Sequence, residues 1–295
     1  MNRGRLFQRL YRATLLITLC FGMVYGQEKP GEKARNQVPT STQWLLDSAG
    51  PAQRDAIKSV YLLVCPKTSK KGTAFLLKSG TMVTDNHVVE GCSGTDLWAL
   101  SPMKEKITFS RMVTDPNRDL ALLRPMRRLE GGFELGSDVS PNVGTTVTTW
   151  GFPLIYDGPA PLLSVGYVAG YNDAHIGAAV VKHIVVNGAF NPGNSGGPLL
   201  VAADNKVVGV VVWKMRLLPE WVQTLITGFG NAGAQLCCVA TQTLPDGTKK
   251  GITSGEASSM ISQQFYDTVQ VMIGEATSAS ELRAFLRDKE SALQQ

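Results

Sequence analysis

One serine in this 295-residue sequence lies in a segment that could present its hydroxyl group to a substrate. Ser195 is part of Asn191–Pro198, which reads NPGNSGGP. Glycine and proline allow such a backbone to turn sharply, so that neighbouring N–H groups can point at one position and form an oxyanion hole. An ordinary hairpin loop could have the same composition, so a catalytic assignment requires a base.

Of the three histidines, His87 is the best candidate for that base, because it follows an apolar run at an expected strand-to-turn transition. His175 lies in a polar turn and His183 alternates within an expected strand, which is more typical of surface or core-edge histidines. A serine becomes nucleophilic when an imidazole takes its proton, and a carboxylate must fix the tautomer of that imidazole. Asp119, at the mouth of the apolar strand DLALL, is the best candidate for this acid. The aspartates in polar turns are expected to be solvated: Asp115, Asp138 and Asp157.

Short β-rich runs separated by turn residues must position these groups. Six runs lie in residues 58–135 and six more in residues 136–245, with a Gly-rich break near residues 128–140. We therefore expect an all-β fold of two six-stranded antiparallel β-barrels. The expected strands are Val60–Cys65, Thr73–Leu77, Met82–Thr84, Leu97–Leu100, Ile107–Val113, Leu120–Leu123, Thr145–Trp150, Leu163–Tyr171, Val180–Val186, Leu199–Val201, Val207–Trp213 and Gln235–Thr241.

The last part of the chain, residues 246–295, is expected to be a helical tail. Apolar residues from Met260 to Met272 recur with a helical period, and Ser278 with Glu281 matches a capping box ahead of Leu282. Near the other end, residues 42–58 could form a short helix within an N-terminal arm of residues 27–57.

The first 26 residues are typical of a secretory signal peptide, because arginines precede an apolar stretch of 13 residues. A membrane anchor is the alternative, but a bilayer-spanning helix needs about 20 apolar residues. Four of the 29 basic residues lie in this leader, and the remaining 25 nearly balance the 24 acidic ones. We therefore expect an exported protein, periplasmic or extracellular, with no stable membrane span after cleavage and no nucleic-acid partner.

Four cysteines follow the leader, and an exported chain can keep disulfides. Cys65 and Cys92 are candidates for a pair, although four cysteines allow three pairings. Cys237 and Cys238 are adjacent in an expected strand, where successive side chains face opposite ways. No CxxC pair or histidine cluster has tetrahedral metal spacing, so neither a metal nor a cofactor is expected.

Three motifs in one order resemble the trypsin-like serine proteases of the double β-barrel fold, most closely the bacterial HtrA/DegP type. They are Thr84–Val89 (TDNHVV), Asp119–Leu123 (DLALL) and Gly193–Pro198 (GNSGGP). The resemblance implies that Ser195 is the nucleophile, His87 the general base and then acid, and Asp119 the residue that orients the imidazole. It also implies that the N–H groups of Gly193 and Ser195 form the oxyanion hole.

The sequence departs from the family pattern at several positions. Asn194 stands where pancreatic members carry an aspartate that pairs with a new amino terminus, so activation by that ion pair is not expected. Residues 246–295 are too few for the PDZ module that HtrA-type proteins usually carry. Lys214 stands where pancreatic relatives have glycine, within a segment that by resemblance pairs with the substrate backbone and includes Val212 and Trp213.

The substrate pocket is expected to be uncharged, because by resemblance its floor falls on Ala189, with Phe190 beside it. Phe190 could instead be a core residue. We expect an exported serine endopeptidase that acts on proteins or peptides and prefers small or medium apolar side chains before the scissile bond. The alternative is a binding or chaperone-like protein of the same fold whose triad is not productively arranged or needs a partner. The sequence does not predict the oligomeric state.

Overall fold

The computed structural model describes residues 41–137, 139–176, 179–212, 240–243, 248–268 and 273–294. The expected signal peptide, the first part of the arm, Trp213, Lys214, Cys237 and Cys238 lie outside these ranges. The chain divides into residues 1–40 and residues 41–295, and only the second unit is described below. Within the described residues, no helix is both long enough and apolar enough to span a membrane.

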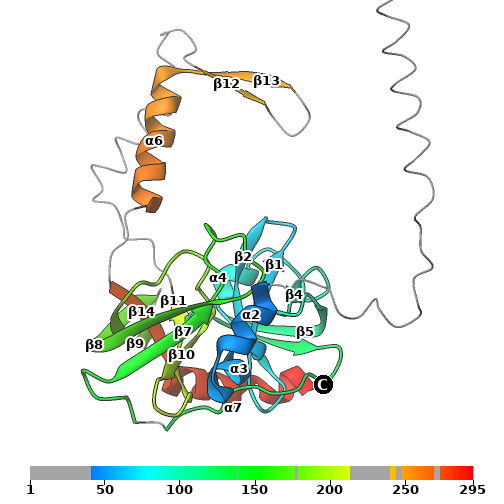
Figure 1. The fold of residues 1–295 in the computed structure, drawn as a ribbon, viewed down its shortest axis with the longest axis vertical. Coiled ribbons are helices and arrows are strands. Elements are labelled where there is room, and N and C mark those ends of the chain that lie inside the picture. Colours follow the sequence, from blue (N-terminus) through cyan, green and yellow to red (C-terminus); the bar gives the residue numbers. More distant parts are fainter. Residues whose placement is uncertain are drawn as a thin grey trace, which may run out of the picture. The chain divides into compact units, whose positions relative to one another are not determined.

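The first barrel confirms the first series of six expected strands (Figure 1). It closes in the order β1–β2–β3–β6–β5–β4. Thr84 at the end of β3 pairs with Ala121 of β6, so the residues after β3 lie beside the turn that precedes β6. This register brings His87 and Asp119 to one end of the barrel. The strands are β1 (Val60–Cys65), β2 (Lys70–Leu76), β3 (Met82–Thr84), β4 (Trp98–Leu100), β5 (Lys106–Asp115) and β6 (Leu120–Pro125).

The second barrel also has six antiparallel strands, in the order β10–β11–β14–β9–β8–β7. Pro198 of β10 pairs with Val210 of β11, so the loop with Ser195 lies beside the end of β11. The strands are β7 (Thr146–Gly151), β8 (Leu162–Ile176), β9 (Ala179–Gly188), β10 (Pro198–Val201), β11 (Val207–Val212) and β14 (Ile273–Ser278).

The second barrel was expected to span residues 136–245 and the helical tail residues 246–295, and the position of the sixth strand shows that this boundary is wrong. The barrel closes with β14, which lies in the expected helical tail and pairs with β11 and β9. Near the expected strand Gln235–Thr241, β12 (Ala240–Thr243) instead pairs with β13 (Lys249–Ile252) in a separate two-stranded sheet. The sequence of β14, IGEATS, lacks strong apolar alternation, because small residues fill its buried end.

The helices in the tail confirm part of that expectation: α6 (Ser254–Thr268) and α7 (Ala279–Gln294). The capping box, however, lies at the start of α6, where Thr253 and Glu256 exchange backbone and side-chain hydrogen bonds. Glu281, the expected capping residue of α7, binds Arg118 of the first barrel instead.

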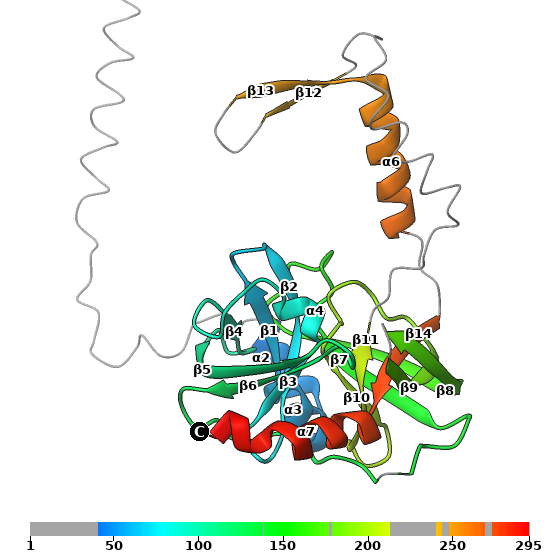
Figure 2. The same cartoon turned by 180° about the vertical axis from the view of Figure 1, so that it is seen from behind.

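The core that joins the two barrels includes α7 and the helices before β1. Figure 2 shows α7 running along both barrels, and its Phe285 is fully buried with Leu120 of β6 and Leu200 of β10 in one apolar cluster. The segment expected as a short helix forms α2 (Ser41–Ser48) and α3 (Pro51–Lys58), and Ile57 of α3 belongs to the same cluster. These contacts fix the two barrels against each other.

Candidate active site

Two hydrogen bonds join His87 to Asp119, and a third joins the neighbouring Asn86 to Asp119. The imidazole Nδ1 lies 2.8 Å from Asp119 Oδ2, and the backbone N–H of His87 donates to Asp119 Oδ1 at 2.9 Å. The N–H of Asn86, at the start of the one-turn helix α4 (Asn86–Val89), donates to the carbonyl of Asp119 at 3.1 Å. Asp119 adopts a left-handed backbone, with φ of 54°, which sharpens the turn before β6. The imidazole is therefore oriented by a carboxylate that is itself fixed.

The loop with Ser195 has two glycines in the left-handed region, Gly193 with φ of 99° and Gly196 with φ of 80°. Neither position has space for a side chain. A Cβ atom on Gly193 would overlap Phe152 O, and one on Gly196 would overlap Thr73 O and Thr84 Oγ1. The N–H of Gly196 donates to Val211 O of β11 at 2.8 Å. The backbone around Ser195 is thus a tightly packed turn that requires glycine.

Thr73 of β2 connects the first barrel to this loop, a role that the sequence does not reveal. Its N–H donates to Ser195 O at 2.8 Å, and its hydroxyl donates to Gly193 O at 2.7 Å. The same hydroxyl accepts the N–H of Phe152 at 3.1 Å. Because Thr73 is fully buried, these bonds are shielded from water and fix the position of the loop.

Gly72 shows that the histidine segment and the serine loop converge. A Cβ atom there would lie 2.7 Å from Val88 Cγ1 and 3.2 Å from Ser195 O. Val88 directly follows His87, so both segments pack against the same point of β2. Ser195 itself is buried to 4% exposure, whereas the side chain of His87 is 41% exposed.

A second carboxyl group, that of Asp85, also lies next to His87. Its Oδ2 is 3.9 Å from His87 Nδ1, and its side chain is fully buried. Asp85, His87 and Asp119 are the one group of described residues whose donor atoms are close enough together to bind a metal. In this arrangement His87 Nδ1 already forms its hydrogen bond with Asp119.

The other described histidines and aspartates considered in the sequence lie on the surface or form ion pairs and hydrogen bonds with residues outside the proposed triad. His175 is exposed on β8, whereas His183 is buried, with Nδ1 2.8 Å from Glu275 Oε2 and Nε2 3.4 Å from Thr277 Oγ1. Asp115 was expected to be solvated, but its side chain is 13% exposed and binds Arg118 at 2.6 Å. Asp157 is exposed, and Asp138 lies outside the described residues.

The expected substrate-binding residues are only partly described. Ala189 is half-buried, and Val212 is buried at the end of β11. Phe190 is 5% exposed and belongs to the core of the second barrel, where its ring occupies the space that a side chain on Gly274 would need. This burial favours the alternative that Phe190 is a core residue.

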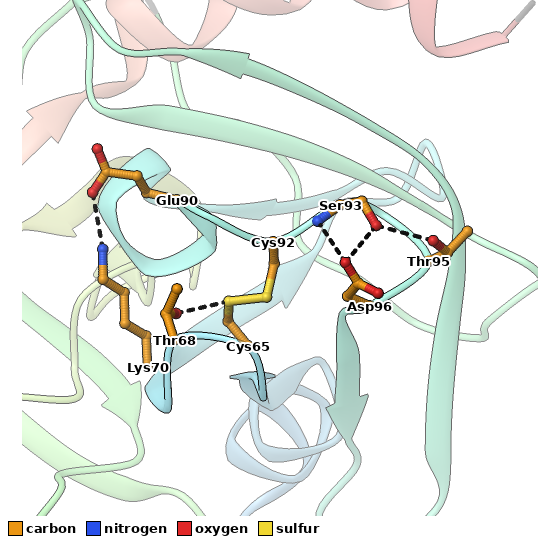
Figure 3. The surroundings of a disulfide bond; sticks show 8 residues. All are labelled: Cys65, Thr68, Lys70, Glu90, Cys92, Ser93, Thr95 and Asp96. Carbon is orange, nitrogen blue, oxygen red and sulfur yellow. Dashed lines mark hydrogen bonds and ion pairs between the residues drawn. A yellow bond between two sulfur atoms is a disulfide. The ribbon is translucent and has the colours of Figure 1, made fainter.

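A disulfide joins Cys65 to Cys92 and confirms that expected pair (Figure 3). Cys65 ends β1, and Cys92 follows α4 by three residues. Nearby, Lys70 and Glu90 form an ion pair at 2.9 Å, which lowers the pKa of Glu90. The bridge therefore ties the segment that carries His87 to the first barrel.

Two antiparallel barrels, with a carboxylate-bound histidine and a Gly-rich serine loop where they meet, define the class of the double-barrel serine proteases. Comparisons with known proteins agree. Residues 72–210 match the family model of the trypsin-like peptidase domain. The chain is 32% identical over 163 residues to a probable periplasmic serine endoprotease DegP-like of Chlamydia pneumoniae, covering 54% of this chain and 30% of that protein.

A second relative is the serine protease Do-like HtrA of Bacillus subtilis, which is 31% identical over 150 residues, covering 48% of this chain and 32% of that protein. The inactive form of Rv3671c protease superposes with a TM-score of 0.53 at 14% identity, covering 86% of this chain and 98% of that chain. The double-barrel part of this chain is therefore similar to trypsin-like serine proteases, including those of the HtrA type. The chain spans about a third of the length of these two curated relatives.

Proposed function

We propose that the chain is an exported serine endopeptidase in which Ser195, His87 and Asp119 form the catalytic triad. His87 takes the proton of the Ser195 hydroxyl as the oxygen attacks the scissile carbonyl, and later gives it to the leaving amine. Asp119 keeps the Nδ1 proton of the imidazole in place and compensates the charge that develops on the ring. Water then attacks the acyl-enzyme with His87 again acting as base.

The observation that carries this proposal is the fixed imidazole of His87, bound to a carboxylate at 2.8 Å beside the turn that contains Ser195. A general base must be held in this way if it is to take the proton of a serine hydroxyl. The N–H groups of Gly193 and Ser195 are proposed as the oxyanion hole. Their support is the left-handed glycine at 193 and the bonds from Thr73 that hold the loop.

Export is supported by the composition of the leader and by the Cys65–Cys92 disulfide, which suits an oxidising compartment. The Chlamydia pneumoniae relative is named as periplasmic. We propose that the mature chain acts in the periplasm or the extracellular space on protein or peptide substrates.

Small or medium apolar side chains are the proposed preference before the scissile bond. The support is the uncharged, half-buried Ala189, since a charged substrate side chain in such a site would lack a partner. A peptide library measures this preference directly. A profile dominated by Arg, Lys or Glu at that position would refute it.

A fluorophosphonate probe tests the triad. We expect the probe to label the full chain at Ser195 and to fail on Ser195→Ala and His87→Ala. Peptide hydrolysis by these variants should fall by about 10⁴-fold or more, with unchanged unfolding midpoints.

His183→Gln is the matched control, because this histidine also has a carboxylate partner but lies away from the serine loop. Labelling of Ser195→Ala, or turnover by it at the wild-type rate, would contradict the proposal. Absence of both labelling and turnover in the wild type would favour the binding or chaperone-like alternative.

A further inference from the structure

Asp85 is a buried carboxyl group next to the proposed triad that the mechanism above does not use. It precedes α4 as the N-cap residue, two positions before His87, and its side chain has no exposed surface. Neither carboxyl oxygen has a hydrogen-bond partner among the described residues. A buried carboxylate without hydrogen bonds is far more costly than a buried neutral acid, so this position needs an explanation.

The two carboxyl groups around the imidazole differ in their hydrogen bonds. Asp119 accepts both the ring and the backbone N–H of His87, whereas Asp85 Oδ2 stays 3.9 Å from the same Nδ1. One ligand atom from each of the three residues lies within 4.8 Å of the other two. Two carboxylates this close do not both ionise readily, and hydrogen bonds to one of them favour its charged form. The hydrogen bonds from His87 therefore favour the charged form of Asp119 over that of Asp85.

The surroundings of Asp85 also favour its uncharged form. Burial raises the pKa of Asp85 well above its usual range, and the charge of Asp119 raises this pKa further. The N–H of Gly196 lowers it, although this N–H already donates its hydrogen bond to Val211 O. The other titratable group of the cluster is His87. Among the described residues that pack here, Thr73 of β2 and Gly196 of the serine loop add no charge.

We propose that Asp85 is a positioning residue that holds an uncharged carboxyl group against the Nδ1 edge of His87, so that Asp119 alone supplies the negative charge. The inference rests on the proposed triad. An ionised Asp85 would stabilise the imidazolium and keep a proton on the ring, which would disable His87 as a base. The uncharged group fills the space beside the ring, excludes water and leaves the imidazole free to accept the serine proton.

Carboxyl carbon NMR tests the protonation state without any need for turnover. The sample is the full chain carrying Ser195→Ala, with ¹³C-labelled aspartate, and the signal of Asp85 is identified by its loss when Asp85→Asn is added. At pH 6 we expect this signal at the position of a protonated acid. An ionised Asp85 at pH 6 would overturn the proposal.

The titration of His87 in the same background gives a second test. Removing an anion beside an imidazole lowers its pKa by roughly 1 to 3 units, so Asp119→Asn should produce a shift of that size. Asp85→Asn should move the His87 titration by less than about 0.5 unit, because an uncharged amide replaces an uncharged acid. A downward shift as large as that of Asp119→Asn would show that Asp85 is an anion and refute the inference.

Kinetics separates positioning from simple stabilisation. Asp85→Ala opens space beside the ring and should lower kcat by roughly 10- to 100-fold with little change in KM, since misplaced catalytic groups lose rate. Asp85→Asn should recover most of that loss. If the alanine and asparagine variants are equally impaired, an uncharged group of this shape is not sufficient and the inference fails.

If wild-type Ser195 is not labelled by the probe, the proposed function fails, while both NMR measurements still decide the protonation state of Asp85.

Discussion

Replacing Thr73 by valine removes a hydroxyl that connects the two barrels and preserves the shape of the side chain. The hydroxyl donates to Gly193 O at 2.7 Å and accepts Phe152 N–H at 3.1 Å, and Thr73 is fully buried. Each buried partner left without its hydrogen bond costs about 1 to 3 kcal/mol. With two partners affected, the Thr73→Val variant should therefore lose about 2 to 6 kcal/mol of unfolding free energy.

Thr149 of β7 offers a matched control within the second barrel. It is also fully buried, but its hydroxyl has no hydrogen-bond partner among the described residues. An unpaired buried hydroxyl costs about 1 to 3 kcal/mol, so Thr149→Val should be neutral or should stabilise the fold by up to about 1 kcal/mol. The same chemical change thus has opposite expected effects at two buried threonines.

Urea denaturation on the Ser195→Ala background measures both changes through the unfolding midpoint at constant m-value. In the active chain, Thr73→Val should also lower kcat by up to roughly 100-fold, because the loop with Gly193 loses its anchor. Thr149→Val should leave kcat unchanged. Equal midpoints for the two variants, or full kcat in Thr73→Val, would refute the argument that this hydroxyl positions the serine loop.

Three further changes have defined outcomes. Reducing the Cys65–Cys92 disulfide, or replacing both cysteines by serine, should lower the free energy of unfolding by about 3.5 kcal/mol, the value for a loop closed by a sequence separation of 27. Equal denaturation midpoints with and without the disulfide would contradict this expectation. Because Arg118 binds Glu281 at 3.0 Å, Glu281→Gln should cost about 1 kcal/mol at low salt and less in 1 M salt; a loss unaffected by salt would argue against an electrostatic origin. The raised pKa of Asp85 means that the folded chain keeps a proton that the unfolded chain releases above about pH 4. The contribution of Asp85 to stability is complete below that pH and is lost as the pH rises through the folded-state pKa. Wild type should therefore lose stability relative to Asp85→Asn as the pH rises. A stability difference that stays constant from about pH 4 to 8 would contradict a raised pKa of Asp85.

Local patterns predicted most of the architecture. Strand runs such as VYLLVC in β1 combine apolar, β-branched and aromatic residues, and their identity as strands depends little on distant parts of the chain. The types of residue at the proposed site follow from chemistry, because a serine nucleophile needs an imidazole and a carboxylate. Pairing Cys65 with Cys92 was one of three possibilities, and the fold selects it by bringing the end of β1 next to the segment after α4.

Other features depend on contacts between distant segments. β14 is a strand because it pairs with β11 and β9, and β11 ends about 60 residues before β14 begins. The small residues Ala276, Thr277 and Ser278 fit the buried end of this strand. Asp85 follows a strand and begins a helical turn, a position where an aspartate is usually solvated. In the fold, Gly196 packs against the backbone N of Asp85, a contact between distant segments that the sequence cannot indicate.

The turn that carries Asp119 shows why the C-terminal segment belongs to the scaffold of the proposed site. The carbonyl of the preceding Arg118 accepts the hydroxyl of Thr277 in β14 at 3.5 Å, and the guanidinium binds Glu281 of α7 and Asp115 of β5. A left-handed aspartate is unfavourable in isolation and persists where its surroundings hold the backbone on both sides. Asn86 provides this support on the histidine side, and β14 with α7 provides it on the other. The last strand and helix therefore orient the carboxylate that orients the imidazole, although neither contributes a residue to the proposed triad.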